Sequence, residues 1–262
     1  MTRRINAYLV CGGWWHDFDY ARLQLLTLLA EHEHVRVQVA QNYEDVEAIV
    51  GCDLLITYTC NVRPSEPAQH ALRDWVERGG RWFALHATNS AIDPPPAGGG
   101  AFTTPRAFPR FADTLGSQFL SHPAIEPYEV TVSPGAHDDP LVAGIEPFHA
   151  NDELYLSELH GAIEVLLETR WFGDSGPGFA EHEWPIDEPR PVMYRRPLGD
   201  GCVLYFTLGH CRSHFDMIHP PFNGRYWPTI ERGSWELDEF RTLLRRGIEW
   251  AASGSTDVDE EA

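Results

Sequence analysis

A histidine in the segment Gly79–Ser90 stands at a position where enzymes carry out chemistry. The segment predicts the end of a helix, an apolar strand over Trp82–Leu85, and a turn that presents His86. Hydrolases of similar layout place a nucleophilic cysteine or serine at such a strand-to-helix elbow, where it attacks a carbonyl. An imidazole there is better suited to moving a proton or to binding a metal ion. The sequence therefore indicates histidine chemistry.

Three more of the thirteen histidines occupy similar positions. His16 and His122 each follow a glycine-rich turn or an apolar run, and His210 follows a predicted strand and Gly209, which repeats the arrangement of His86. Any one of them could equally be a loop histidine whose ring makes only local hydrogen bonds. Two or more that share a cleft would favour a function.

The tetrapeptide Asp152-Glu153-Leu154-Tyr155 adds carboxylates and a phenol to these histidines. Such groups could orient an imidazole or bind sugar hydroxyls, and a surface turn is the alternative. A divalent metal such as zinc requires three or four converging ligands, and the sequence has no spacing that is diagnostic of zinc. The side chains that could supply such ligands are His86, His122 and His210, together with Glu153 or His16.

The elements that must position these residues alternate between apolar strands and amphipathic helices in the first third of the chain. This alternation predicts a parallel sheet covered on both faces, with ligands bound beyond the carboxyl ends of its strands. The loops that carry His16, Asn61 and His86 belong to that edge. The predicted strands are Ile5–Cys11, Val35–Ala40, Leu54–Thr59 and Trp82–Leu85, and the predicted helices begin after Asp17 or Asp19, at Asp45 and after Ser65.

The remainder of the chain is less regular. Its predicted elements are a helix over Phe108–Leu115, strands over Tyr128–Val132, Ile163–Thr169, Pro191–Arg195 and Cys202–Thr207, and a final helix capped by Ser234 with Arg245 and Arg246 near its end. An antiparallel pair is expected around Gly199-Asp200-Gly201. The aromatic loop Phe215–Trp227 could form a lid or wall over a ligand, and a plain packed loop is the alternative.

Length and composition restrict the classes of function. We expect one domain over residues 1–253 and a disordered acidic tail over 254–262. A formal charge of −19 argues against nucleic-acid binding, and the chain has no apolar segment long enough for a membrane. Five cysteines without a CxxC spacing favour a reducing compartment, so we expect a cytoplasmic protein. All 20 basic residues are arginine, which excludes lysine Schiff-base chemistry.

Several short motifs resemble those of the trehalose-utilisation (ThuA-like) family. They extend in order over most of the chain: Gly12-Gly13-Trp14-Trp15-His16, Phe83-Ala84-Leu85-His86-Ala87, Phe119-Leu120-Ser121-His122-Pro123, Asp152-Glu153-Leu154-Tyr155, and Gly199–Tyr205 leading to Gly209-His210. The resemblance implies an α/β fold, flavodoxin-like or class I glutamine amidotransferase-like. In that fold a mostly parallel central sheet with added antiparallel strands lies in a three-layer sandwich.

The same resemblance bears on the reaction. His86 takes the place of the amidotransferase nucleophile and His210 that of its base, while Arg212 stands where an acidic residue is expected. The triad for glutamine hydrolysis is therefore absent. The resemblance implies carbohydrate catabolism on oxidised sugars such as 3-keto-glycosides, which a partner sugar dehydrogenase would produce. The first motif adds Trp14 to the expected substrate contacts.

The leading hypothesis is an enzyme that acts on a keto-sugar or related glycoside by isomerisation, elimination or hydrolysis. His86 and His210 are then base and acid and Glu153 orients them. His16, His122, Asp152, Tyr155, Asn61 and Trp14 contact the substrate. The alternatives are a non-catalytic sugar-binding or regulatory module and a metal-dependent hydrolase. Exposed aromatic residues near the C-terminal loop could also form a homo-oligomer contact.

Overall fold

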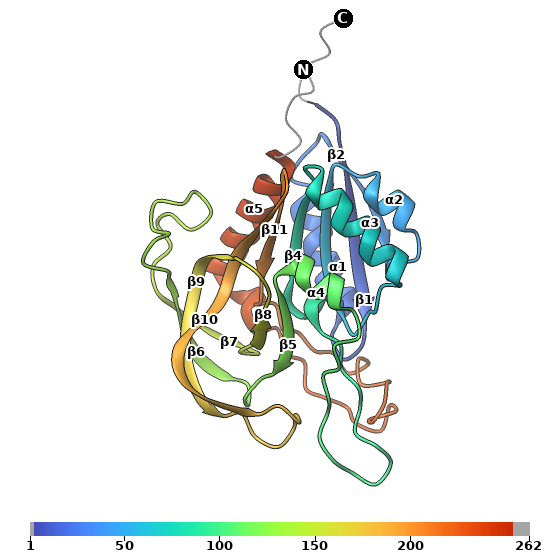
Figure 1. Ribbon diagram of the computed structural model, residues 1–262, viewed down its shortest axis with the longest axis vertical. Coiled ribbons are helices and arrows are strands. Elements are labelled where there is room, and N and C mark those ends of the chain that lie inside the picture. Colours follow the sequence, from blue (N-terminus) through green and yellow to red (C-terminus); the bar gives the residue numbers. More distant parts are fainter. Residues whose placement is uncertain (1–2, 254–262) are drawn as a thin grey trace, which may run out of the picture.

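The computed structural model describes residues 3–253 and places the strands in one large sheet and one small one (Figure 1). In chain order the strands are β1 (Ile5–Gly13), β2 (Val35–Ala40), β3 (Leu54–Cys60), β4 (Arg81–Leu85), β5 (Ser117–Ser121), β6 (Glu126–Val132), β7 (Phe148–Asp152), β8 (Leu156–Leu159), β9 (Glu164–Asp174), β10 (Glu183–Leu198) and β11 (Gly201–Phe206). The helices are α1 (Phe18–Leu29), α2 (Val46–Val50), α3 (Glu66–Glu77), α4 (Pro109–Leu115) and α5 (Asp238–Ser253). The predicted tail 254–262 lies outside the described residues.

The large sheet has the strand order β2-β1-β3-β4-β11-β10-β9-β6-β7. Its first five strands pair in parallel, as the alternation of strands and helices predicts. The other four extend it by antiparallel pairing, and β5 pairs with β8 in the small sheet. The antiparallel part therefore contains four of the nine strands, more than the few added strands that the sequence predicts. The carboxyl ends of β1, β3, β4 and β11 meet at one edge.

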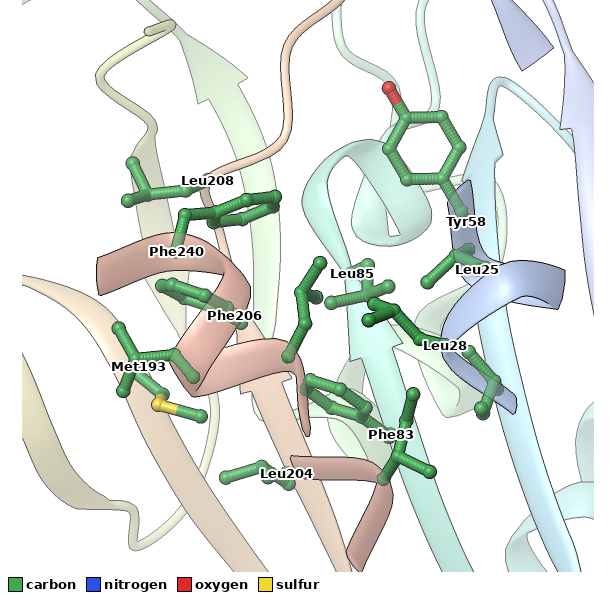
Figure 2. Close-up of a cluster of buried hydrophobic side chains, with 14 of the residues drawn as sticks. Leu25, Leu28, Tyr58, Phe83, Leu85, Met193, Leu204, Phe206, Leu208 and Phe240 are labelled. Atoms are coloured by element: carbon green, nitrogen blue, oxygen red, sulfur yellow. The ribbon is translucent and has the colours of Figure 1, made fainter. Parts of the chain in front are cut away.

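Successive side chains of the parallel strands point to opposite faces of the sheet and pack into two hydrophobic layers, one on each face. Leu9 of β1 faces α1 and α5, whereas its neighbour Val10 packs on the side of α2, α3 and α4. Figure 2 shows the first layer, with Phe240 of α5 against Phe206 of β11. The result is a three-layer α/β/α arrangement, which confirms the predicted fold class.

Helix caps agree with the sequence in two places and disagree in a third. The carboxylate of Asp17 accepts a hydrogen bond from the backbone N–H of Tyr20, and Ser65 caps α3 in the same way. Ser234, however, does not cap the final helix, because residues 233–236 form a separate 3₁₀ turn before α5 begins at Asp238. The last turn of α5 holds no basic residue, so the prediction for Arg245 and Arg246 was also wrong.

All five cysteines lie within the described residues, and each is free and buried. Burial raises the pKa of Cys11 to about 12 and that of Cys202 to about 11, because a thiolate is poorly solvated there. We expect none of the five thiols to react quickly with a disulfide reagent such as DTNB in the native protein, and all five to react in denaturant. A fast-reacting thiol in the native state would contradict this prediction.

Among the described residues, no helix combines the length and apolar character that crossing a membrane requires.

Candidate active site

The chain turns sharply at His86, directly after β4. This residue has a φ of 48°, a value that side chains other than glycine rarely adopt, and it begins a short 3₁₀ helix that ends at Asn89. The hydroxyl of Tyr205 donates a hydrogen bond to the carbonyl of His86 and fixes the turn from the neighbouring strand β11. The predicted elbow is present, and it directs a fully buried imidazole toward the sheet edge.

Four side chains from distant parts of the chain converge beside this elbow: His16, His86, Glu153 and His210. We call them the imidazole–carboxylate cluster. One donor atom from each lies within 4.8 Å of all the others. Nε2 of His16 is 2.9 Å from Nε2 of His86, and Oε2 of Glu153 is 3.4 Å from the same His86 atom. Oε1 of Glu153 is 3.1 Å from Nδ1 of His210. The cluster joins the loops that follow β1, β4, β7 and β11.

Each imidazole of the cluster is held by its outward-facing nitrogen. In every ring that nitrogen lies at hydrogen-bond distance from an oxygen, so it carries the proton and donates. This leaves the opposite nitrogen of each ring directed toward the centre of the cluster. The outer contacts are His86 Nδ1 to the Thr207 carbonyl at 2.8 Å, His16 Nδ1 to the Trp14 carbonyl at 3.2 Å, and His210 Nε2 to Oε2 of Glu231 at 2.8 Å.

Two side chains of the cluster, Glu153 and His210, are charged near neutral pH. Burial opposes ionisation of this carboxyl, but His210 and His122 outweigh it and hold the pKa of Glu153 well below its usual range. Burial also acts against a charge on His210, yet Glu153 and Glu231 raise its pKa to about 9. Burial lowers the pKa of His16 to about 3. The carboxylate of Glu153 therefore lies between a charged imidazole, that of His210, and a neutral one, that of His16.

A pocket of about 210 Å³ opens onto one side of the cluster. His16 and Glu153 form part of its wall, whereas His86 and His210 lie behind them with 0% and 1% of their surface exposed. The roles of base and acid predicted for His86 and His210 require contact with a substrate, and neither side chain lines the pocket. Aromatic residues make up much of the remaining wall: Trp15, Phe102, Phe119, Phe179 and Phe222.

Three polar side chains of the pocket wall surround Glu153. The hydroxyl of Tyr155 lies 3.3 Å from Oε2 of Glu153 and 3.3 Å from Nε2 of His86. Nε2 of His122 is 3.8 Å from Oε1 of Glu153, and its Nδ1 is 2.7 Å from the Pro123 carbonyl. The guanidinium of Arg212 lies 3.6 Å from the same Glu153 oxygen. His122 therefore borders the cluster and is not one of its four members, which differs from its predicted place among the metal ligands.

Asp152 does not face the pocket, contrary to its predicted role as a substrate contact. Its buried carboxylate accepts hydrogen bonds from backbone N–H groups of three separate segments. These groups belong to Gly209 and His210 after β11, to Glu153, and to Ser234 in the 3₁₀ turn. Asp152 thus fixes the backbone that carries His210 and Glu153.

Asn61 and Trp14 are likewise absent from the pocket wall, so neither is placed as a substrate contact. The side-chain oxygen of Asn61 accepts a hydrogen bond from the backbone N–H of Ile92 at 2.9 Å and so ties two loops together. Trp14 stacks on His219 with a ring separation of 4.6 Å. The neighbouring residue Trp15 takes the position in the pocket instead.

Sequence reasoning missed most of the aromatic wall. Phe102 and Phe179 are joined by a backbone bridge between two loops, one following the Pro/Gly-rich residues 93–100 and one within the acidic segment 173–188. Phe222 belongs to the aromatic loop Phe215–Trp227, which therefore supplies part of the wall, as one of the two readings of that loop expects. The only available signal was that these three segments interrupt the regular alternation of strands and helices.

Comparison with known proteins gives a consistent family. The family model ThuA, described as "Trehalose utilisation", matches residues 6–224. A ThuA-like protein of Parabacteroides merdae has 17% identity and a TM-score of 0.60, covering 99% of this chain and 94% of that one. One from Bacteroides uniformis has 16% identity and a TM-score of 0.61, covering 95% and 92%. A β-galactosidase of Rahnella sp. R3 matches only in fold, at a TM-score of 0.51 over 32% of its length. A search of curated proteins gave no significant match.

Proposed function

The chain belongs to the ThuA family of trehalose utilisation, and from this carbohydrate-related role we propose that it is an enzyme that acts on a keto-sugar or related glycoside. The observation that carries the proposal is the pocket beside the imidazole–carboxylate cluster. Aromatic faces such as those of Trp15 and Phe119 suit the C–H faces of a sugar ring. A volume of about 210 Å³ fits one ring, with the rest of a glycoside extending outward.

The reaction we propose is removal of a proton from the carbon next to the ketone. His122 is the base, because its Nδ1 donates to the Pro123 carbonyl and its Nε2 keeps a lone pair beside the pocket. The electron pair moves to the ketone oxygen and forms an enediolate. Burial and the charge of Glu153 raise the pKa of Tyr155 well above its usual value, so its phenol stays protonated. Its O–H donates to Glu153 in the free protein and would turn to the ketone oxygen when the substrate binds. Arg212 adds a positive charge.

His86 and His210 act in this proposal as positioning residues rather than as base and acid. Both are buried behind the pocket wall, and both contact Glu153, which in turn accepts the hydrogen bond of Tyr155. Proton abstraction of this kind begins both isomerisation and elimination. When the reaction runs in D₂O, the carbon of the product that carries deuterium and the identity of the product distinguish the two reactions.

Substitution of His122 by glutamine tests the proposal. We expect the variant to exchange the α-proton of a 3-keto-disaccharide for solvent deuterium at least about 10²-fold more slowly than the native enzyme, because it has lost its general base. Proton NMR in D₂O measures this exchange whichever product forms. His137→Ala is the matched control, since His137 is exposed and lies away from the pocket. Saturable sugar binding without exchange in the native protein would favour the non-catalytic module.

A further inference from the structure

We propose that His16, His86, His210 and Glu153 form a binding site for a divalent first-row transition metal ion. The positions of the ring protons in the cluster favour such a site. Nδ1 of both His16 and His86 donates to a backbone carbonyl, so in the neutral rings both Nε2 atoms carry lone pairs. These two atoms are 2.9 Å apart. Two lone pairs at that distance repel unless a cation or a proton lies between them.

A shared proton would satisfy only this pair, whereas the third imidazole also directs a ring nitrogen toward the same centre. Nδ1 of His210 is buried and lies at an ion-pair distance of 3.1 Å from Oε1 of Glu153, but outside the geometry of a hydrogen bond. A buried polar atom without a partner is unfavourable and rare. A metal ion at the centre of the cluster would satisfy His210, the facing pair of nitrogens and the carboxylate together.

The outer contacts of the three rings support the same assignment. Metal-binding imidazoles usually donate their other N–H to a carbonyl or carboxylate, which fixes the tautomer and the ring orientation. All three rings do so, and for His210 the acceptor is the carboxylate of Glu231. The inner nitrogens of the three rings thus face the centre of the cluster, and an oxygen atom on the outer side holds each ring in that orientation.

The donor set selects the class of ion. Three imidazole nitrogens and one carboxylate suit Zn²⁺ and its first-row neighbours, whereas Mg²⁺ and Ca²⁺ prefer oxygen donors. Tetrahedral zinc with bonds of about 2.0–2.1 Å separates its donor atoms by about 3.3 Å. Four of the contacts between donor groups, at 2.9, 3.1, 3.4 and 3.6 Å, lie near that value. All the donors lie within 4.8 Å of one another, so binding of the ion would draw the widest pairs closer together.

Two of the ligands, His16 and Glu153, line the pocket, so one side of the ion would face the bound sugar. This last step rests on the proposed function: a ketone or hydroxyl oxygen of the substrate would approach the ion as a fifth ligand. The ligand roles of the three imidazoles are compatible with His122 as the base, because His122 is not a ligand.

Metal binding can be measured without any activity. We expect tag-free protein, stripped with a chelator and titrated with Zn²⁺ in a calorimeter, to bind about one equivalent and to unfold at a higher temperature when loaded. His16→Ala, His86→Ala and His210→Ala should each lose this binding, while His137→Ala keeps it. Glu231→Gln should bind about 10- to 100-fold more weakly, as expected for a residue that orients a ligand.

One measurement does not depend on the folding of variants. The stripped native protein loaded with Co²⁺ should show the visible absorption bands of a four- or five-coordinate site. Binding of less than about a tenth of an equivalent of Zn²⁺ by the native protein, or full binding by all three alanine variants, would overturn the metal site. Zinc binding in a protein that neither binds nor exchanges a 3-keto-disaccharide would instead overturn the proposed function alone.

Discussion

Replacement of Asp152 by alanine is expected to lower the free energy of unfolding by about 3–5 kcal/mol. The side chain is buried, and its two oxygens accept hydrogen bonds from the backbone N–H groups of Gly209, His210, Ser234 and Glu153. Alanine would leave these donors buried without an acceptor. Because the same hydrogen bonds hold the backbone of His210, the imidazole–carboxylate cluster should loosen as well.

Urea denaturation followed by circular dichroism measures this loss. Asp152→Asn should lie between the native protein and the alanine variant, because its amide keeps one acceptor oxygen but turns an NH₂ group toward the remaining donors. The exposed Asp138→Ala variant is a matched control that should change stability little. A loss below about 1 kcal/mol in Asp152→Ala would contradict the anchoring role.

Replacement of Glu153 by glutamine should reduce the exchange rate of the substrate α-proton by about 10²- to 10³-fold, the scale on which loss of one oxyanion donor slows a reaction, because the carboxylate holds the Tyr155 hydroxyl at the pocket wall. Its carboxylate contacts His210, His86 and Tyr155, and it is the acceptor for the Tyr155 hydroxyl. Glutamine has nearly the same shape but no charge, so it removes the electrostatic partner with little change in packing.

The deuterium-exchange assay on a folded variant measures this effect. Circular dichroism should show that Glu153→Gln keeps the native secondary structure, and the exposed Glu236→Gln variant should retain the native rate. A decrease of less than about tenfold in folded Glu153→Gln would remove Glu153 from the reaction centre.

The parallel half of the sheet could be predicted because most of its strands are apolar runs bounded by turn residues, and β2 alternates apolar and polar residues. The strands β5, β7 and β8 could not. β5 is buried along its whole length yet contains serine and glutamine, and Ser117 is tolerated inside because its hydroxyl lies 2.7 Å from that of Tyr194, 77 residues away. No pattern in the sequence around Ser117 predicts a hydrogen-bond partner so far along the chain.

The candidate site shows the same division. His16, His86 and His210 could be found because each follows the end of a parallel strand or its turn, and such ends meet at one edge. Which of two neighbouring carboxylates faces the pocket could not be predicted. Asp152 and Glu153 are adjacent, and the backbone N–H groups of Gly209, His210 and Ser234, all distant in the sequence, turn the first one away.

The convergence of the four donors was also beyond local patterns. The predicted metal set contained His122, because it follows an apolar run as His86 does. In the structure, His16 and Glu153 complete the group of four, and His122 lies 3.8 Å from Glu153 on the pocket side. The packing of the loops decides that His122 lies beside the cluster and not within it.

The span of the chain between His16 and His210 has a consequence for biosynthesis. The cluster draws on loops that follow the first and the last parallel strands, and its outer support at Glu231 comes later still. A growing polypeptide therefore cannot complete the imidazole–carboxylate cluster until the segment that carries Glu231 has left the ribosome.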